Sequence, residues 1–298
     1  MIRFVAVGEC MVELTRRDER TMALGYAGDT ANTAVYLKRL GGEAAEVRFV
    51  TAVGDDPLSA ELQAHLEGEG LIVDPQVVPG ASPALYIVNT DEAGERTFTY
   101  YRESSPVRKL FADGVVQGQA AVFLSADLVY FSAITLQLLT QDGRRRLIAL
   151  LEEARGRGSR IAFDSNYRIR GWPSREAAAD AVAAAARVTD IALPSLADEQ
   201  LLHPGSTVDD VIERYGAAGA DEVVVKDGSN PTHVWVDRDV QRFDCVARIP
   251  VDTTGAGDSF NAAYLYGRAS GLPVTEAVQA AQKLASHVIG HPGAIVPV

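Results

Sequence analysis

The sequence predicts an α/β fold of three layers (α/β/α), in which helices cover both faces of a mostly parallel central sheet, with a small second β-sheet added. Three observations favour this fold class. Short apolar segments alternate with amphipathic segments along most of the 298 residues, which is the pattern of repeated strand–helix units. Many apolar segments are hydrophobic throughout, as strands of a parallel sheet buried on both faces are. Between about residues 72 and 104 the alternation stops, and strand follows strand.

The first strand–helix units open the chain. Residues 2–8 are a short apolar run that ends in glycine, which predicts a buried strand. Residues 28–42 carry apolar residues at helical spacing and end in two glycines, so we expect a helix that Asp29 or Thr30 could cap. Two further elements follow, a strand over 47–54 and a helix over 56–70.

The strand-rich segment predicts the small second sheet. It contains IVDPQVV, SPALYIVNT and ERTFTYYR, which alternate as half-buried strands do. The residues DEAG at 91–94 predict the turn of a β-hairpin between the last two segments. We expect one domain over residues 1–298, with a lid formed mainly by about 72–104 and a contribution from about 10–26.

The strand–helix alternation resumes after this segment. Predicted strands lie at 127–134, 160–168, 190–195 and 222–228, predicted helices at 141–158, 176–188 and 208–219, and a hairpin at 232–248. In open α/β folds, ligands bind at the carboxyl ends of the strands. Polar residues that follow these strands, or open the last helical region, should therefore line one cleft: Asn166, Tyr167, Arg168, Ser195, Lys226 and Asp258.

Composition narrows the classes of function. The net charge of −12 is opposite in sign to the basic footprint that nucleic-acid binding needs. The N-terminus lacks the pattern of a signal peptide, and the longest apolar stretches are too short to cross a membrane. The two cysteines have no metal-binding spacing and favour a reducing compartment. We expect a cytoplasmic protein with neither nucleic acid nor membrane as a partner.

Residues 251–267, VDTTGAGDSFNAAYLYG, predict an anion site at the start of a helix. A helix N-terminus carries free N–H groups and the positive end of the dipole. Glycine lets an anion approach that backbone closely. Gly255, Ala256 and Gly257 could therefore cradle a phosphate, and Asp258 could accept a proton from an attacking hydroxyl. An anion hole with a base is what phosphoryl transfer to an alcohol requires.

On the residues alone, other interpretations of this stretch stay open. The glycines could form a tight turn, with Asp258 complementing the helix dipole. G-x-G at a helix start is also the core of a dinucleotide-binding motif, but the third glycine and the later acidic residue are missing here, which makes a nicotinamide-dependent oxidoreductase the weaker hypothesis. The phosphate-binding motif GxxxxGK[ST] is absent from the sequence.

The same stretch resembles the C-terminal signature of the ribokinase-like (PfkB) carbohydrate kinases. GDTANTAVYLKRLGG at 28–42 resembles the sugar-side segment of that family, and the resemblance covers essentially the whole chain. Within the family, members that phosphorylate 2-keto-3-deoxygluconate are the most similar. The segments that carry this similarity are GECMVEL (8–14), AGDTANTAVYL (27–37), ERTFTYYRESSP (95–106) and FDSNYRIRGW (163–172).

The resemblance implies a ribokinase-like sandwich with a β-sheet lid and an ATP-dependent kinase. The implied reaction is phosphorylation of 2-keto-3-deoxy-D-gluconate to the 6-phosphate, with Mg²⁺ at the phosphates. A monovalent cation such as K⁺ and a homo-oligomer are further implications. The alternatives are a sibling kinase for 2-keto-3-deoxygalactonate, fructose or ribose, and a non-catalytic sugar-acid sensor.

The resemblance also implies a role for each matching residue. The catalytic group is Asp258 as base, the anion hole of Gly255, Ala256 and Gly257, and Arg168 between substrate and phosphates. The substrate would be held by Gly28, Asp29, Asn32, Tyr86, Tyr100, Arg102, Arg168 and Asp258. ATP would be held by Ser195, Lys226, Gly228, Gln282 and the three anion-hole residues.

Two local patterns bear on these implied roles. Tyr100 and Arg102 lie two apart in an extended run and should share a face, where they could read a carboxylate; an edge strand guarded by charges is the alternative. Many relatives carry an N-x-x-E motif that organises magnesium, and here Ser195 and Asp198 stand at its two ends. Asp198 would therefore contact the metal through water, since magnesium usually keeps several waters.

Overall fold

The central sheet of the protein has nine strands and is parallel over most of its width. The computed structural model describes residues 1–90, 96–246 and 248–298. Across the sheet the order is β13 (Asp239–Phe243), β12 (Thr232–Val236), β11 (Glu222–Val225), β10 (Ile191–Ala192), β9 (Arg160–Asp164), β8 (Leu128–Ser132), β1 (Ile2–Val7), β4 (Ala45–Val53) and β5 (Ile72–Val77). The strands from β11 to β5 in this order all pair in parallel with their neighbours. β12 and β13 form the predicted antiparallel hairpin, and β12 pairs in antiparallel fashion with β11.

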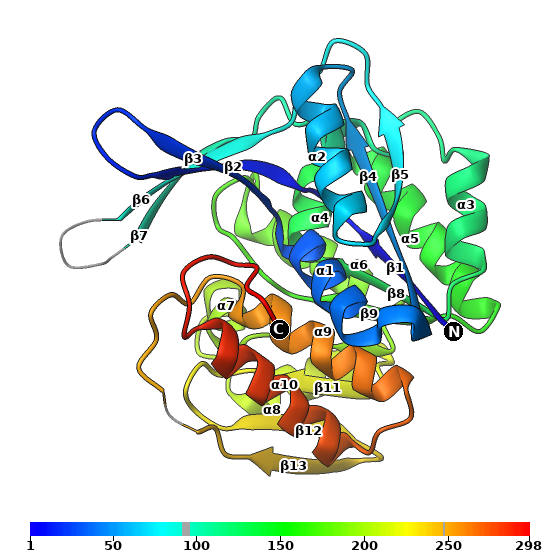
Figure 1. Ribbon diagram of the computed structural model, residues 1–298. Helices are drawn as coiled ribbons and strands as arrows, with labels where there is room; N and C mark the ends of the chain where they lie inside the picture. Colours follow the sequence, from blue (N-terminus) through cyan, green and yellow to red (C-terminus); the bar gives the residue numbers. More distant parts are fainter. Residues whose placement is uncertain (91–95, 247) are drawn as a thin grey trace.

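Helices cover both faces of this sheet, as the sequence predicts. One apolar core packs against α1 (Asp29–Gly41), α2 (Pro57–Gly68), α9 (Ala256–Ala269) and α10 (Val274–Val288). The other packs against α3 (Gln117–Leu124), α4 (Ala133–Leu138), α5 (Gln141–Gly156), α6 (Arg175–Ala186), α7 (Leu196–Leu202) and α8 (Val208–Ala218). Figure 1 shows α1, α9 and α10 across one face, which confirms the three-layer sandwich.

The strands are apolar throughout because both of their faces are buried. In β1, Phe4 and Ala6 belong to the core beneath α1, whereas Val5 and Val7 belong to the core beneath α5. Successive side chains of a strand point to opposite faces, so every position of such a strand meets a packed layer. No helix among the described residues is long and apolar enough to cross a membrane.

A second sheet of four strands projects from the body of the molecule (Figure 1). Its order is β3 (Met22–Ala27), β2 (Met11–Arg16), β6 (Leu85–Thr90) and β7 (Arg96–Tyr101). β6 and β7 pair in antiparallel fashion, as expected of the hairpin, while the predicted turn at 91–94 lies outside the described residues. We call these four strands the small sheet.

The structure corrects three details of the predicted elements. The segment 72–77 belongs to the main sheet as β5, paired with β4, so the small sheet does not begin near residue 72. Its side chains are half-buried, so its mix of polar and apolar residues resembles that of the strands that follow it. The sequence also predicts a strand through residue 134, whereas β8 ends at Ser132, whose capping box starts α4. α3, α4 and α7 were not predicted.

Candidate active site

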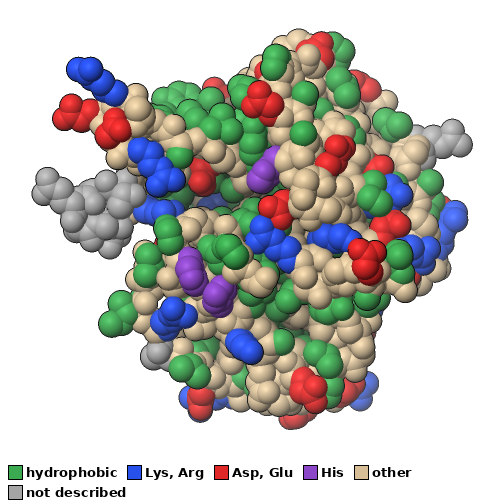
Figure 2. Space-filling model, viewed as in Figure 1, with side chains coloured by type: hydrophobic (Ala, Val, Ile, Leu, Met, Phe, Trp, Pro, Cys, Tyr) green, Lys and Arg blue, Asp and Glu red, His purple; other side chains and the backbone are tan. Residues whose placement is uncertain are grey.

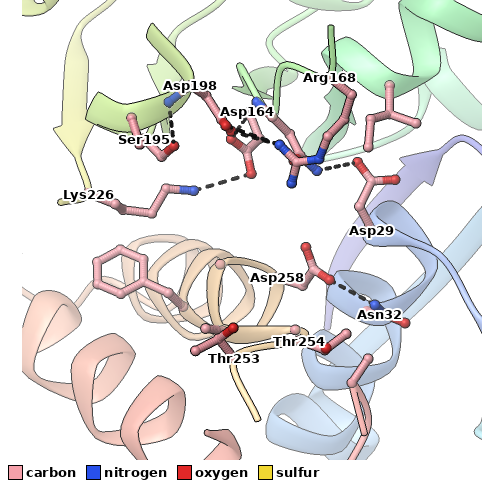
Figure 3. A pocket seen from close by; sticks show the side chains of 18 of the residues that line it. Asp29, Asn32, Asp164, Arg168, Ser195, Asp198, Lys226, Thr253, Thr254 and Asp258 are labelled. Carbon is pink, nitrogen blue, oxygen red and sulfur yellow. Dashed lines mark hydrogen bonds and ion pairs between the residues drawn. The ribbon is translucent and has the colours of Figure 1, made fainter. Parts of the chain in front are cut away.

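One large cavity lies at the carboxyl ends of the central strands, between the main body and the small sheet. Its volume is about 2000 Å³. The six polar residues expected to share a cleft all line it, as do all the site residues that the resemblance implied. Figure 3 labels ten of the lining side chains, which come from α1, the end of β9, the segments that follow β9, β10 and β11, the loop before α9, and α9 itself. The sequence therefore predicted the location of the cavity correctly.

The N-terminus of α9 forms one wall of the cavity and is built to leave its backbone bare. Gly255 is the N-cap, with φ of 76°, and no side chain caps the helix. A β-carbon at Gly255 would lie 2.4 Å from the carbonyl oxygen of Ala294, so glycine is required. A β-carbon at Gly257 would lie 3.9 Å from Lys226 Nζ, which places the ammonium beside the helix start. This arrangement suits an anion.

Asp258 lies in the first turn of α9 and is 9% exposed. Its Oδ2 accepts a hydrogen bond from Asn32 Nδ2 at 2.8 Å, and its carbonyl accepts one from Thr33 Oγ1 at 3.3 Å. These contacts join the starts of α1 and α9. Burial, and then the charge of nearby Asp29, raise the pKa of Asp258 to about 8. A carboxyl with such a pKa is suited to exchange a proton near neutral pH.

Asp29 faces the cavity instead of capping α1. Its Oδ2 accepts hydrogen bonds from Ser132 Oγ at 2.5 Å and from Asn166 Nδ2 at 2.9 Å. The N-cap of α1 is Gly28, which makes no side-chain cap, so the expectation that Asp29 or Thr30 caps this helix is wrong. A β-carbon at Gly28 would lie 2.0 Å from the carbonyl oxygen of Glu9, and this close approach explains the glycine.

Lys226 is held by a buried network that the sequence did not predict. Its Nζ donates to Asp164 Oδ2 at 3.2 Å and to Asn261 Oδ1 at 2.9 Å. Asn261 Nδ2 donates in turn to Asp164 Oδ2 at 2.7 Å and to the hydroxyl of Tyr130 at 3.1 Å. The signal available in the sequence was positional, because Asp164 ends a strand and Asn261 lies one helical turn after Asp258.

Arg168 and Asp198 form an ion pair on the opposite side of the cavity (Figure 3). Arg168 Nη1 lies 3.1 Å from Asp198 Oδ1 and 3.2 Å from Oδ2. Burial raises the pKa of Asp198, and the charge of Arg168 opposes that shift. Ser195 caps α7 by accepting a hydrogen bond from the Asp198 amide. The next residue, Glu199, is fully buried against Arg214 and Tyr215, so of these two neighbouring acids it is Asp198 that lines the cavity.

The small sheet contributes an aromatic and basic wall. Tyr86 and Tyr100 are register partners in β6 and β7, and their ring centroids lie 5.6 Å apart. The Arg102 guanidinium lies over the Tyr100 ring, 6.0 Å from its centroid. All three line the cavity, so Tyr100 and Arg102 share a side as their spacing predicts.

An ion pair connects the small sheet to the loop before α9. Arg96, at the start of β7, places Nη1 2.5 Å from Oδ2 of the buried Asp252. Asp252 also accepts hydrogen bonds from the amides of Thr254 and Gly293. Asp252 therefore joins the small sheet, the loop before α9 and the C-terminal segment. No local pattern signals this pairing, because Arg96 and Asp252 lie far apart in the chain.

The remaining predicted residues line the far end of the cavity. Gly228 follows β11, and Gln282 lies in α10, where its Nε2 donates to the carbonyl of Phe243 at 3.3 Å. Cys245 and Val246 complete this end, next to the β12–β13 hairpin. One continuous cavity therefore extends from the small sheet to the β12–β13 hairpin and α10.

The fold and this site together define a carbohydrate kinase of the ribokinase type. The family model for pfkB family carbohydrate kinases matches residues 1–298, and the chain belongs to that family. Two relatives are similar over nearly their whole length. The 2-dehydro-3-deoxygluconokinase of Dickeya dadantii (strain 3937) is 38% identical, over 98% of this chain and 96% of its own. The 2-dehydro-3-deoxygluconokinase of Escherichia coli (strain K12) is 36% identical, over 99% of this chain and 97% of its own.

Solved structures share the same architecture. An Escherichia coli structure, provisionally assigned as ribokinase II and in complex with ATP and Mg²⁺, has a TM-score of 0.83 to this chain. Its sequence is 21% identical, and the match covers 99% of this chain and 94% of that one. At 21% identity, this similarity shows that the two proteins share a fold.

The raised pKa of Asp258 predicts a pH-dependent cost to stability. Because this pKa is about 8 when folded and about 4 when unfolded, the folded state binds the extra proton between these values. The contribution of Asp258 to the free energy of unfolding should therefore fall as pH rises from 4 to 8. Asp258→Asn removes this cost, so its melting temperature should match the wild type near pH 4 and exceed it at pH 8. A difference in melting temperature between Asp258→Asn and the wild type that does not depend on pH would contradict the raised pKa of Asp258.

Proposed function

We propose that the protein transfers the γ-phosphoryl group of ATP to the terminal hydroxyl of 2-keto-3-deoxy-D-gluconate (2-dehydro-3-deoxygluconate), which yields the 6-phosphate. The observation that carries this proposal is a buried carboxyl, Asp258, at a bare helix N-terminus in a cavity whose other wall presents Tyr100 and Arg102. Relatives at 35–38% identity named for this reaction support the substrate. The aromatic and basic wall suits a sugar that carries a carboxylate.

The residues present fit ATP. The uncapped start of α9 offers backbone N–H groups to a phosphate, and the Lys226 ammonium lies beside Gly257. We assign Gly255, Ala256 and Gly257 to the transferred phosphoryl group, and Ser195, Lys226, Gly228 and Gln282 to the rest of the nucleotide. All of them line the same cavity.

Mg²⁺ would enter with the phosphates. Within the parts of the chain that the structure describes, no group of three or more His, Cys, Asp or Glu side chains is arranged to hold a metal ion. Asp198 stands where many relatives carry the glutamate of the N-x-x-E motif, and it lines the cavity. Its carboxylate is paired with Arg168. We therefore propose that Asp198 contacts the ion through water. When bound, Mg²⁺ supplies positive charge that offsets the phosphate oxygens.

Within this scheme the chain's own residues do the following. Asp258 accepts the proton of the attacking hydroxyl, and Asn32 fixes the orientation of its carboxyl. The α9 backbone and Lys226 stabilise negative charge on the phosphoryl group. Arg168 lies between substrate and phosphates, Gly28, Asp29 and Asn32 face the sugar hydroxyls, and Tyr86, Tyr100 and Arg102 close over the sugar acid. The small sheet acts as a lid that excludes water, so that ATP is not hydrolysed in the absence of substrate.

We further propose that the enzyme is a cytoplasmic homodimer that pairs through the small sheet. The side of that sheet turned away from the cavity is also apolar, with Leu14 opposite Leu24 and Leu85 opposite Tyr101. Leu24 and Tyr101 are 51% and 58% exposed. Hydrophobic side chains gather on and beside this sheet in Figure 2. A sheet that is apolar on both sides needs cover on both, and a second copy supplies it.

The first experiment measures ADP release from the purified protein with ATP and Mg²⁺, with and without K⁺. The acceptors are 2-keto-3-deoxygluconate, its galactonate epimer, fructose and ribose. We expect turnover on the 2-keto-3-deoxy acids and little on the neutral sugars. Preference for fructose or ribose would assign a sibling kinase, and ATP binding without turnover would favour the sensor. A rate that rises with K⁺ would support the monovalent cation.

Asp258→Asn should lower turnover by ~10² to 10⁴ while leaving substrate binding nearly intact, the usual scale for a positioned base. The wild-type kcat/KM should rise with pH and level off above about 8, because the base must lose its proton first. Asp190→Asn is the matched control, since Asp190 is buried but lies outside the cavity. Wild-type turnover in Asp258→Asn would remove the base assignment.

The dimer is tested by light scattering. The wild type should have about twice the chain mass of 31.9 kDa, and Leu24→Glu should halve it by burying a charge in the interface. Val240→Glu is the control, because Val240 is similarly exposed on β13, away from the small sheet. A monomeric wild type would overturn the proposed dimer.

A further inference from the structure

Two glutamates contact the wall that the small sheet presents to the cavity. Glu9 follows β1 and is 2% exposed, and Glu13 lies four residues later in β2. Neither is among the residues that line the cavity. Both come from the GECMVEL segment, and neither glutamate has a part in the function assigned so far.

Glu9 holds Arg102. Its Oε2 accepts a hydrogen bond from Arg102 Nε at 2.6 Å, and its Oε1 accepts one from the hydroxyl of Ser105. A guanidinium carries five N–H donors in a fixed plane. Because the Nε–H points at Glu9, the terminal nitrogens at the other end of that plane carry the N–H groups that can meet a ligand. Glu9 therefore fixes the direction in which the guanidinium fork faces.

Glu13 holds Tyr86. The two are register partners across β2 and β6, and the Tyr86 hydroxyl donates a hydrogen bond to Glu13 Oε2. Thr15 Oγ1 donates to Glu13 Oε1 at 3.2 Å. On the other side of Glu13 the register partner is Gly25, where an added β-carbon would lie 3.7 Å from Oε1. The glutamate is thus set between two strands with its carboxylate toward Tyr86.

The hydrogen bond to Glu13 decides what Tyr86 can recognise. A phenol has one proton, and a carboxylate can only accept, so that proton is committed to Glu13. Toward the cavity the Tyr86 oxygen offers lone pairs alone. It can accept a hydrogen bond from a substrate hydroxyl, but it cannot donate one to a substrate carboxylate. Burial and Glu13 also raise the pKa of Tyr86, so the phenol keeps its proton.

The two glutamates differ in charge balance. The charge of Glu9 is paired with that of Arg102, whereas the donors to Glu13 within residues 1–90, 96–246 and 248–298 are two neutral hydroxyls. The region around Tyr86 therefore keeps a negative charge that disfavours an anion nearby. The terminal nitrogens of Arg102 offer a fork that matches a carboxylate.

We propose that Glu9 and Glu13 are positioning residues that divide the small sheet into a carboxylate-reading part at Arg102 and a hydroxyl-reading part at Tyr86. This division sets both the preference for a sugar acid and the direction in which the acid binds. The inference rests on the proposed function, because it assigns the substrate's carboxylate to one end of that same site.

The test compares Glu9→Gln and Glu13→Gln with the wild type, using 2-keto-3-deoxygluconate and fructose as acceptors. Glu9→Gln should raise KM for the acid about tenfold, with kcat, KM for ATP and KM for fructose nearly unchanged, because only a hydrogen-bonded charge pair is loosened. Glu13→Gln should raise KM for both sugars, because each presents hydroxyls. The double variant Glu13→Gln/Tyr86→Phe should have the same KM values as Tyr86→Phe alone, because Glu13 acts through the Tyr86 hydroxyl.

Two further variants separate positioning from folding. Glu222→Gln is the matched control, because Glu222 is buried with two arginines and a tyrosine outside the cavity. Arg102→Lys keeps the charge beside Glu9 but removes the fork, so it should repeat the acid-specific rise in KM even if Glu9→Gln does not fold.

The outcomes distinguish the inference from the function beneath it. Equal rises in KM for acid and fructose in Glu9→Gln and Arg102→Lys, or additive effects of Glu13→Gln and Tyr86→Phe, would overturn the inference while the wild type still phosphorylates the acid. A wild type that neither phosphorylates 2-keto-3-deoxy acids nor binds them by calorimetry would overturn the proposed function, and the inference with it.

Discussion

The hydrogen bond between Asn32 and Asp258 joins the first turns of α1 and α9, and the geometry of the cavity depends on it. Both helices begin at the carboxyl edge of the main sheet, and both start at a glycine that closely approaches another segment. Their bare N-termini and the shared carboxyl are thereby fixed on one wall. Burial of that carboxyl raises its pKa, which turns an ordinary first-turn aspartate into a candidate base.

Around this wall, basic side chains are each held by a specific acid. Lys226 is paired with Asp164, Arg168 with Asp198, Arg102 with Glu9, and Arg96 with Asp252. In a chain with a net charge of −12, such pairs place positive charge around the cavity, where the proposed sugar acid and ATP would meet. Each pair also fixes the direction of a long side chain, which would otherwise lose rotamer freedom on binding. Precision of placement is therefore the main contribution of these acids.

Both faces of the small sheet contribute to the proposed function, and this makes it unlike the main sheet. Its cavity side carries Tyr86, Phe98 and Tyr100, and its other side carries Leu14 and Leu24. Arg96 connects it to the loop before α9. The proposed dimer contact on one side and substrate binding on the other would thus involve the same four strands.

The sequence by itself determined the strand–helix order, the three-layer class and the edge of the sheet where the cavity lies, because periodicity and chain polarity are local properties. It also located the uncapped start of α9, since glycine spacing is local. Only the tertiary structure decided that residues 72–77 join the main sheet, that Asp29 faces the cavity, and that Asp164, Asn261, Glu9 and Asp252 hold the basic side chains. These contacts join residues far apart in the chain, and no local pattern encodes which carboxylate meets which cation.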